Sequence, residues 1–297
     1  MKKILLTTTA LTMLAGAAAA DISLSGSGRI GIVSTGGATN VTHRFRINAN
    51  ASGETDGGLT FGAYVRLNMN GGAVGAIGAP RLYIGNGMAT LTVGNAGGAI
   101  SQAGNIWGCG IGFTGSCADM AAGGNAFTWV THSSGAAGAS VVRLDFALGS
   151  ANISISGGSA SGVRRDADGA LIADGDTEIA ANFQMGTASV GIGYDSGTDA
   201  AGGTLLNVSF GAGSATIGGH IAMSNGTTGY MGTITTAMGA GSLYAGFGNQ
   251  LNGGATATQA AYGVSYSQSL GGGANASVAI ASAAGTVTTT AGITFGF

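Results

Sequence analysis

The sequence predicts an all-β membrane protein: an antiparallel up-and-down transmembrane β-barrel of sixteen strands. Apolar and polar residues alternate with a period of two along most of the chain, which is the pattern of β-strands. Only 7% of the residues are charged, against about 25% in ordinary soluble domains. The connections between the alternating segments are short and long by turns, as the two rims of such a barrel require.

Residues 1–20 have the features of a secretory signal peptide. Lys2 and Lys3 give a positive start, residues 4–14 are apolar, and residues 18–20 are alanines that suit a cleavage site. A transmembrane anchor is the alternative, but the apolar region is too short to span a bilayer easily. We therefore expect export of a barrel domain over 21–297. That domain has no lysine and more acidic than basic residues, so it lacks the charge of a nucleic-acid-binding protein.

Alternation predicts each strand in turn. In residues 59–68, for example, Leu, Phe, Ala, Val and Leu occupy one face, and Thr, Gly, Tyr, Arg and Asn occupy the other. No region shows a sustained helical period. The sixteen predicted strands cover residues 22–33, 41–52, 59–68, 80–85, 88–94, 139–146, 152–160, 177–186, 188–195, 203–211, 215–224, 230–238, 242–248, 258–268, 274–282 and 289–297.

The predicted connections fall into two classes. The short, Gly-rich ones are 53–58, 186–187, 212–214 and 239–241, and the longer ones are 34–40, 69–79, 95–138, 161–176 and 249–257. An even number of strands brings both termini to the rim with the short turns, which is the periplasmic rim in a bacterial outer membrane.

The apolar face of each predicted strand is expected to face lipid. A soluble β-sandwich would also alternate, but no segment is left to cover sixteen apolar faces, and residues 200–297 contain no Asp, Glu, Lys or Arg. In a closed barrel every backbone N–H and C=O can be paired, so a neutral, apolar exterior is stable in lipid.

Three segments resemble a known family. They are DISLSGSGRIGIV (21–33), RLYIGNGMATLTVGNAGGAI (81–100) and the terminal ITFGF (293–297). The chain resembles the sixteen-stranded general porins of Gram-negative bacteria, most closely the alpha-proteobacterial type. The resemblance implies a homotrimer in outer-membrane lipid and lipopolysaccharide, with a water-filled pore. It also implies that the third loop, 95–138, folds into the lumen as a constriction, and that the barrel assembly machinery reads the final aromatic strand, which ends at Phe297.

Five arginines are candidates for a basic ladder along the pore. Four of them lie at inward positions of the first three predicted strands: Arg29, Arg44, Arg46 and Arg66. The fifth, Arg81, lies at the start of the fourth strand. Such a ladder would set a transverse field that orients and selects solutes. The alternative is that these arginines are scattered over a wet face. The family usually places several acids on the opposing loop, whereas this loop offers only Asp119, so the transverse field is weaker and the opening leans toward tolerating anions. The net negative charge of the domain acts against this at long range.

The constriction loop also carries two cysteines and a tryptophan. Cys109 and Cys117 are predicted to form a disulfide at its tip, since a lone cysteine pair in an exported protein is usually bridged. A metal site would need more ligands than the nearby His132 provides. Trp107 could pack the loop against the wall or offer a stacking platform for a solute.

Other charged residues have two interpretations each. Arg143, Asp145 and Glu178 have inward parity, and the first two could pair with neighbours across the sheet. Segment 164–178 is acidic enough to suggest a calcium site, although its glycine spacing departs from the EF-hand pattern. A solvated outer loop, or cation-bridged lipopolysaccharide, would use the same residues: Asp166, Asp168, Asp174 and Asp176.

The expected function is passive diffusion of small hydrophilic solutes and ions through a porin. No catalytic motif is present, and no cofactor other than calcium is suggested. A non-conducting outer-membrane barrel acting as an adhesin or structural protein is the alternative, but it would need a lumen filled by side chains, whereas these inward faces are rich in small residues. A secreted β-solenoid would need a fixed glycine repeat, which is absent.

Overall fold

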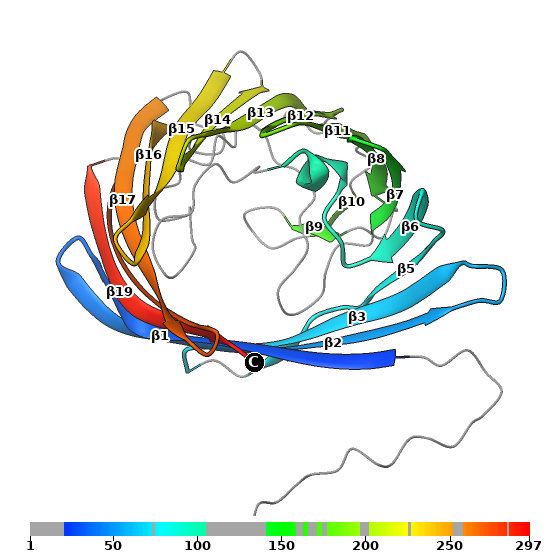
Figure 1. Ribbon diagram of the computed structural model, residues 1–297, viewed down its shortest axis with the longest axis horizontal. Helices are drawn as coiled ribbons and strands as arrows, with labels where there is room; N and C mark the ends of the chain where they lie inside the picture. Colours follow the sequence, from blue (N-terminus) through cyan, green and yellow to red (C-terminus); the bar gives the residue numbers. More distant parts are fainter. Residues whose placement is uncertain are drawn as a thin grey trace, which may run out of the picture.

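The computed structural model describes residues 21–72, 75–104, 141–158, 163–165, 171–173, 177–196, 202–224, 227–251, 258–283 and 285–297. They form a closed antiparallel barrel in which each strand of the wall pairs with the next wall strand along the chain, β8 with β11, and β1 pairs with β19 (Figure 1). The strands of the wall are β1 (Asp21–Thr35), β2 (Ala38–Glu54), β3 (Thr60–Asn70), β4 (Ala76–Ile77), β5 (Arg81–Gly85), β6 (Ala89–Gly94), β7 (Val141–Leu148), β8 (Ala151–Gly158), β11 (Thr177–Met185), β12 (Ala188–Asp195), β13 (Gly203–Ala212), β14 (Ala215–Ser224), β15 (Thr227–Met238), β16 (Gly241–Leu251), β17 (Thr258–Gly271), β18 (Ala274–Ala283) and β19 (Thr286–Gly296).

The sixteen-strand prediction is confirmed. The sheet contains 17 segments, but β4 and β5 both pair with β3 and share one position in the wall. The interruption lies at Pro80, which has no N–H to donate to a neighbouring strand. Two further segments, β9 (Val163–Arg165) and β10 (Leu171–Ala173), pair only with each other within the described chain.

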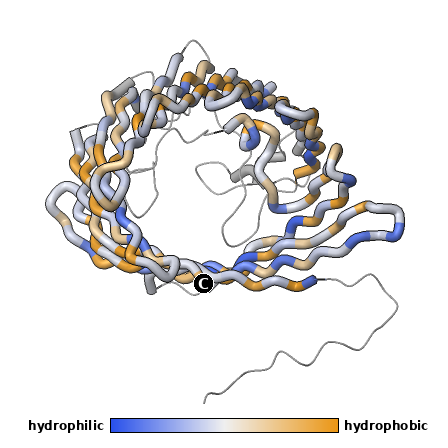
Figure 2. The backbone as a smooth tube through the Cα atoms, in the orientation of Figure 1, coloured by the Kyte–Doolittle hydropathy of each residue, from blue (hydrophilic) through white to orange (hydrophobic). Residues whose placement is uncertain are grey.

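Apolar side chains cover the outside of the wall. Leu24 is 71% exposed and Val41 74% exposed, and large apolar residues recur at every second position along the strands. Figure 2 shows this alternation of apolar and polar residues around the ring. Exposure of such an apolar surface to water is unfavourable in free energy, whereas contact with lipid is not. The alternation therefore determines which face of each strand points to lipid and which to the lumen. Within the described residues, no helix is long and apolar enough to cross a membrane.

The barrel closes where the two ends of the wall meet. The N–H of Gly26 donates to the carbonyl of Phe297 (2.7 Å), and the N–H of Phe297 donates back to Gly26 (3.1 Å). The rings of Phe297 and Phe295 lie on the backbone of Gly26 and Gly28, where a Cβ would run into them. The Phe297 ring also stacks on Phe45, with 5.9 Å between centroids.

The connections at the rim opposite the termini are less uniform than the sequence suggested. The expected loop at 34–40 is a tight hairpin at Gly36 and Gly37, whose φ values of 58° and 90° suit glycine. As a result β1 and β2 pair up to Thr35 and Ala38 and reach 15 and 17 residues. About 9–11 residues suffice to cross a bilayer, so this hairpin continues beyond the membrane.

The chain turns inward after β6. It forms a short 3₁₀ helix, η1 (Ala99–Gln102), which lies inside the ring against β8, β11 and β12 (Figure 1). Ala99, Ile100 and Ala103 are fully buried there. The start of the predicted constriction loop therefore runs along the inner wall, and residues 105–138 of that loop lie outside the described residues.

Candidate functional site

Guanidinium groups gather on the inner face of the first strands. Arg29 and Arg44 are directly opposite each other across β1 and β2, and Arg46 is the next inward residue along β2. Arg66 of β3 lies opposite Asn48, and Arg81 of β5 lies opposite Tyr64. We refer to these five arginines, of β1, β2, β3 and β5, as the arginine cluster.

Neutral groups orient three members of the arginine cluster, Arg46, Arg66 and Arg81. Arg46 Nε donates to Asn68 Oδ1 (2.8 Å), and Arg66 Nε donates to Asn48 Oδ1 (2.9 Å). The guanidinium carbon of Arg81 lies 4.3 Å from the centroid of the Tyr64 ring, within cation–π range, and that of Arg66 lies 5.6 Å away. These contacts with amide oxygens and an aromatic face fix the directions of the three guanidinium groups.

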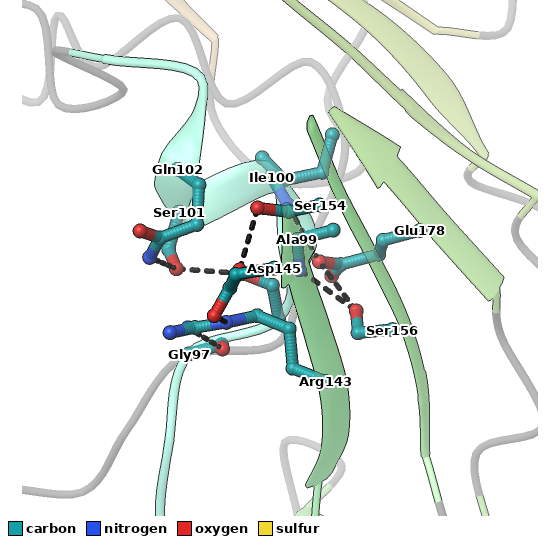
Figure 3. Close-up of polar contacts among 11 residues, drawn as sticks. Gly97, Ala99, Ile100, Ser101, Gln102, Arg143, Asp145, Ser154, Ser156 and Glu178 are labelled. Atoms are coloured by element: carbon teal, nitrogen blue, oxygen red, sulfur yellow. Dashed lines mark hydrogen bonds and ion pairs between the residues drawn. The ribbon is translucent and has the colours of Figure 1, made fainter. Parts of the chain in front are cut away.

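Acidic side chains line the lumen further around the ring. Asp145 Oδ2 accepts from Arg143 Nε at 3.0 Å, so these two neighbours on one face of β7 form an ion pair. Asp145 Oδ1 also accepts from Ser154 Oγ of β8 at 2.6 Å. The terminal Nη1 of the same guanidinium group donates to the carbonyl of Gly97 at 2.6 Å (Figure 3). Arg143 thus joins the wall to the inward-turning chain.

Glu178 binds the beginning of η1. Its carboxylate is fully buried, and Oε2 accepts from the N–H of Ile100 at 2.9 Å (Figure 3). Ser156 Oγ accepts from the N–H of Ala99 at 2.7 Å. The first backbone N–H groups of a helix have no partner within it, so these oxygens satisfy them. Gly98 allows the close approach, because a Cβ there would overlap the carboxylate.

The other end of η1 is held by an amide and a histidine. Asn207 Nδ2 donates to the carbonyl of Ala103 (3.1 Å), and Asn207 Oδ1 lies 2.7 Å from Nδ1 of the buried His220. On β12, Gly191 and Gly193 leave room for η1, since a Cβ at either would overlap Ala103 or press on Ile100. We name this set of contacts, from Gly97 to Ala103 and the wall beneath, the η1 seat.

Sequence reasoning missed the η1 seat. It treated Glu178 only as a charge in the lumen, and it gave His220 and Asn207 no role. One signal was present: Ala180, Leu205 and Ala222 are apolar at inward positions, whereas the next inward residues along the same strands include Glu178, Asn207 and His220. In the structure these residues form a buried cluster with η1. Apolar residues on the wet face of a barrel strand mark a part of the wall that another segment covers.

Several predicted site residues lie outside the described residues. They are Trp107, Cys109, Cys117, Asp119 and His132 in the long loop and Asp166, Asp168, Asp174 and Asp176 in the acidic segment.

The sequence and fold match known proteins. The family model of the Gram-negative porins matches residues 7–286. Two mutants of the Rhodopseudomonas blastica porin are similar in structure, a quintuple mutant at TM-score 0.77 and 20% identity and a triple mutant at TM-score 0.76 and 21% identity. Each comparison covers 93% of this chain and 100% of the other. No curated protein matches the sequence.

At about 20% sequence identity the similar structures show the fold alone. The family model, which matches most of the chain, shows membership of the family. The porin barrel also accounts for the apolar exterior, which belongs in a bacterial outer membrane. The chain is a member of the Gram-negative porin family and is located in the bacterial outer membrane.

Proposed function

We propose that the protein forms a water-filled channel for passive diffusion of small hydrophilic solutes and ions. The observation that carries this proposal is a closed sixteen-strand wall whose inward face is polar and rich in small residues. Barrels of about sixteen strands leave an aqueous channel, whereas eight-stranded ones are filled by side chains. The η1 seat supports the proposal too, because it starts the long loop along the inner wall rather than out from the rim.

The arginine cluster is the proposed selectivity element. Arg29 and Arg44 are cross-strand partners, and Arg46 and Arg66 are held nearby by asparagine amides. This concentration of positive charge on one part of the wall lowers the energy of an anion passing it and raises that of a cation. Further round the wall, Arg143 and Asp145 cancel each other as an ion pair. We therefore propose a channel that favours anions.

Further proposals rest on family membership and sequence. They are a homotrimer, export by a signal peptide over 1–20 and recognition of the strand ending at Phe297 by the barrel assembly machinery. The predicted Cys109–Cys117 disulfide would stiffen the constriction loop. A calcium site, or alternatively lipopolysaccharide bridged by divalent cations, would use Asp166, Asp168, Asp174 and Asp176.

Liposome swelling tests the channel. Liposomes that contain the folded protein should swell in solutions of small neutral solutes, at rates that fall steeply as solute size rises. Protein-free liposomes and liposomes with heat-unfolded protein are the controls. A barrel that inserts but gives no swelling with the smallest solutes would contradict the proposal and favour an adhesin or structural barrel.

A further inference from the structure

The inner wall contains a pocket where η1 ends. It has a volume of about 180 Å³ and lies over β11 to β16, with Ala103 and Gly104 at one side. Its position follows from the strand register. Gly218 of β14 lies between Ser209 and Thr233 on the neighbouring strands and lines the floor, and the Thr233 hydroxyl leans over it, where a Cβ would overlap Oγ1.

Uncharged hydroxyl groups surround that floor. Ser209 and Thr233 lie beside Gly218, and Thr216 and Thr235 form the next inward row toward the rim. Within the described residues, the hydroxyls of these four side chains make no side-chain hydrogen bond. Each hydroxyl can both donate and accept. The pocket therefore offers several donor and acceptor sites within a few ångströms of one another.

The remaining lining adds an aromatic ring and further polar groups, but no charge. Tyr244 of β16 lies opposite Thr235 at one edge, and Asn182 and His220 line other parts. Residues 200–297 hold no Asp, Glu, Lys or Arg, so this half of the wall differs chemically from the arginine cluster. Among the described lining residues, no Asp, Glu, Lys or Arg offers a charged solute a counter-charge for the hydration that it would lose here.

We propose that this pocket binds an uncharged polyhydroxylated solute of the size of a monosaccharide or sugar alcohol. The proposal deepens the channel function and rests on it. Such a solute presents several hydroxyls, which match the hydroxyls of Ser209, Thr216, Thr233 and Thr235 on the wall. The volume is several times the ~30 Å³ of a water molecule in the liquid, so the pocket accepts part or all of a small sugar. The lumen then has an anion-favouring side and a side that binds neutral solutes.

Two variants test the pocket while keeping its shape. Thr233→Val and Thr235→Val replace a hydroxyl by a methyl group of similar size, and the double variant removes both hydroxyls. Thr290→Val is the matched control, because Thr290 is a buried inward residue of β19 that does not line the pocket. Binding of glucose and of sorbitol to the detergent-folded protein is measured by saturation-transfer NMR. This readout does not depend on conduction.

We expect millimolar binding of both solutes to the wild type and to Thr290→Val. The double variant should bind at least about tenfold more weakly, since two hydrogen-bonding groups are lost. Gluconate and glucosamine should bind more weakly than glucose. Equal glucose binding by the double variant and the wild type would overturn the assignment, as would no binding by the wild type.

Bilayer conductance is recorded on the same preparation, so that the two proposals can fail separately. A conducting protein that does not bind glucose contradicts the pocket alone. A protein that binds glucose through Thr233 and Thr235 but does not conduct contradicts the channel and leaves the site itself supported.

Discussion

Like charges crowd one part of the inner wall. Arg29 and Arg44 face each other across β1 and β2, and Nε of Arg44 has no hydrogen-bond partner within the described residues. Repulsion among guanidinium groups destabilises the barrel, but water and mobile anions in a lumen screen it. An arrangement that costs stability without improving packing is characteristic of a functional site.

Removal of charge from this cluster should change ion selectivity. In the Arg44→Gln, Arg46→Gln double variant the permeability of anions relative to cations should fall by at least about fivefold. One charge ~4 Å from an ion contributes about 1 kcal/mol at the dielectric constant of water, and a fivefold change corresponds to that energy. Reversal potentials at 0.1 M salt or below measure it. Arg44→Lys, Arg46→Lys keeps the charge and serves as the control; the same reversal potential in all three proteins would contradict a role in selectivity.

The contacts of Phe297 predict a second effect at the residue scale. A Gly26→Ala substitution places a Cβ against the Phe297 ring and should destabilise the closed barrel by about 1–3 kcal/mol. The midpoint of urea-induced unfolding in detergent measures the change. Gly157→Ala is the control, since a Cβ at Gly157 meets no other atom within 4 Å. Equal midpoints for the two variants would show that the ring can move away at no cost.

At the scale of single elements, η1 is the unusual feature of the fold. It is only four residues long, and 3₁₀ helices of this length have little stability of their own. Its position comes from the wall: Glu178 and Ser156 accept its first N–H groups, and Asn207 donates to the carbonyl of Ala103. The seat therefore fixes the direction in which the long loop leaves β6.

A bulkier residue in the η1 seat, or the loss of an acceptor there, should release this loop. Gly191→Ala directs a methyl group at the carbonyl of Ala103, and Glu178→Ala leaves the N–H of Ile100 without its acceptor. Both variants should be cleaved by chymotrypsin within 105–138 at least about fivefold faster than the wild type, because an unseated loop samples open conformations more often. Gly157→Ala on β8 is again the control. Unchanged cleavage in both variants would show that η1 does not hold the loop.

The same elements show how far sequence reasoning reaches. The strands were predictable because every strand of the wall has lipid on one face and the polar lumen on the other. Apolar and polar residues must therefore alternate along each strand. The inward positions of Arg44 and Arg66 follow from that alternation. The tight turn at Gly36 and Gly37 was not predicted, since polar residues near a strand end suit a loop and a longer hairpin equally well.

The η1 seat was beyond sequence reasoning for a different reason. Residues 95–104 have no periodic pattern, and their partners are distant in sequence, as with Ala103 and Asn207, which are 104 positions apart. Contacts of this kind depend on the closed barrel, which brings β8, β11, β12 and β13 to one side of the lumen. Local sequence therefore predicted the wall well and the segment inside it poorly.

At the scale of the whole molecule, closure makes the barrel stable in a membrane. The pairing of β1 with β19 leaves no unpaired strand edge among the described strands of the wall, so the backbone groups of the wall bond to each other across its circumference. The charge on the inner surface is unevenly distributed, with five arginines on β1 to β5, the Arg143–Asp145 ion pair on β7, the buried Glu178 on β11, and no Asp, Glu, Lys or Arg from residue 200 onward. An open pore with this distribution should conduct ions and should prefer anions.

Single-channel recording in a planar bilayer tests this central claim most directly. The purified, folded protein is added to a bilayer with a salt gradient, and the current steps and the reversal potential are measured together. We predict discrete, ohmic current steps, in groups of three if the protein is a trimer, and a reversal potential with the sign of anion preference. A protein that inserts as a folded barrel and gives no current steps, or whose reversal potential has the sign of cation preference, would contradict the account.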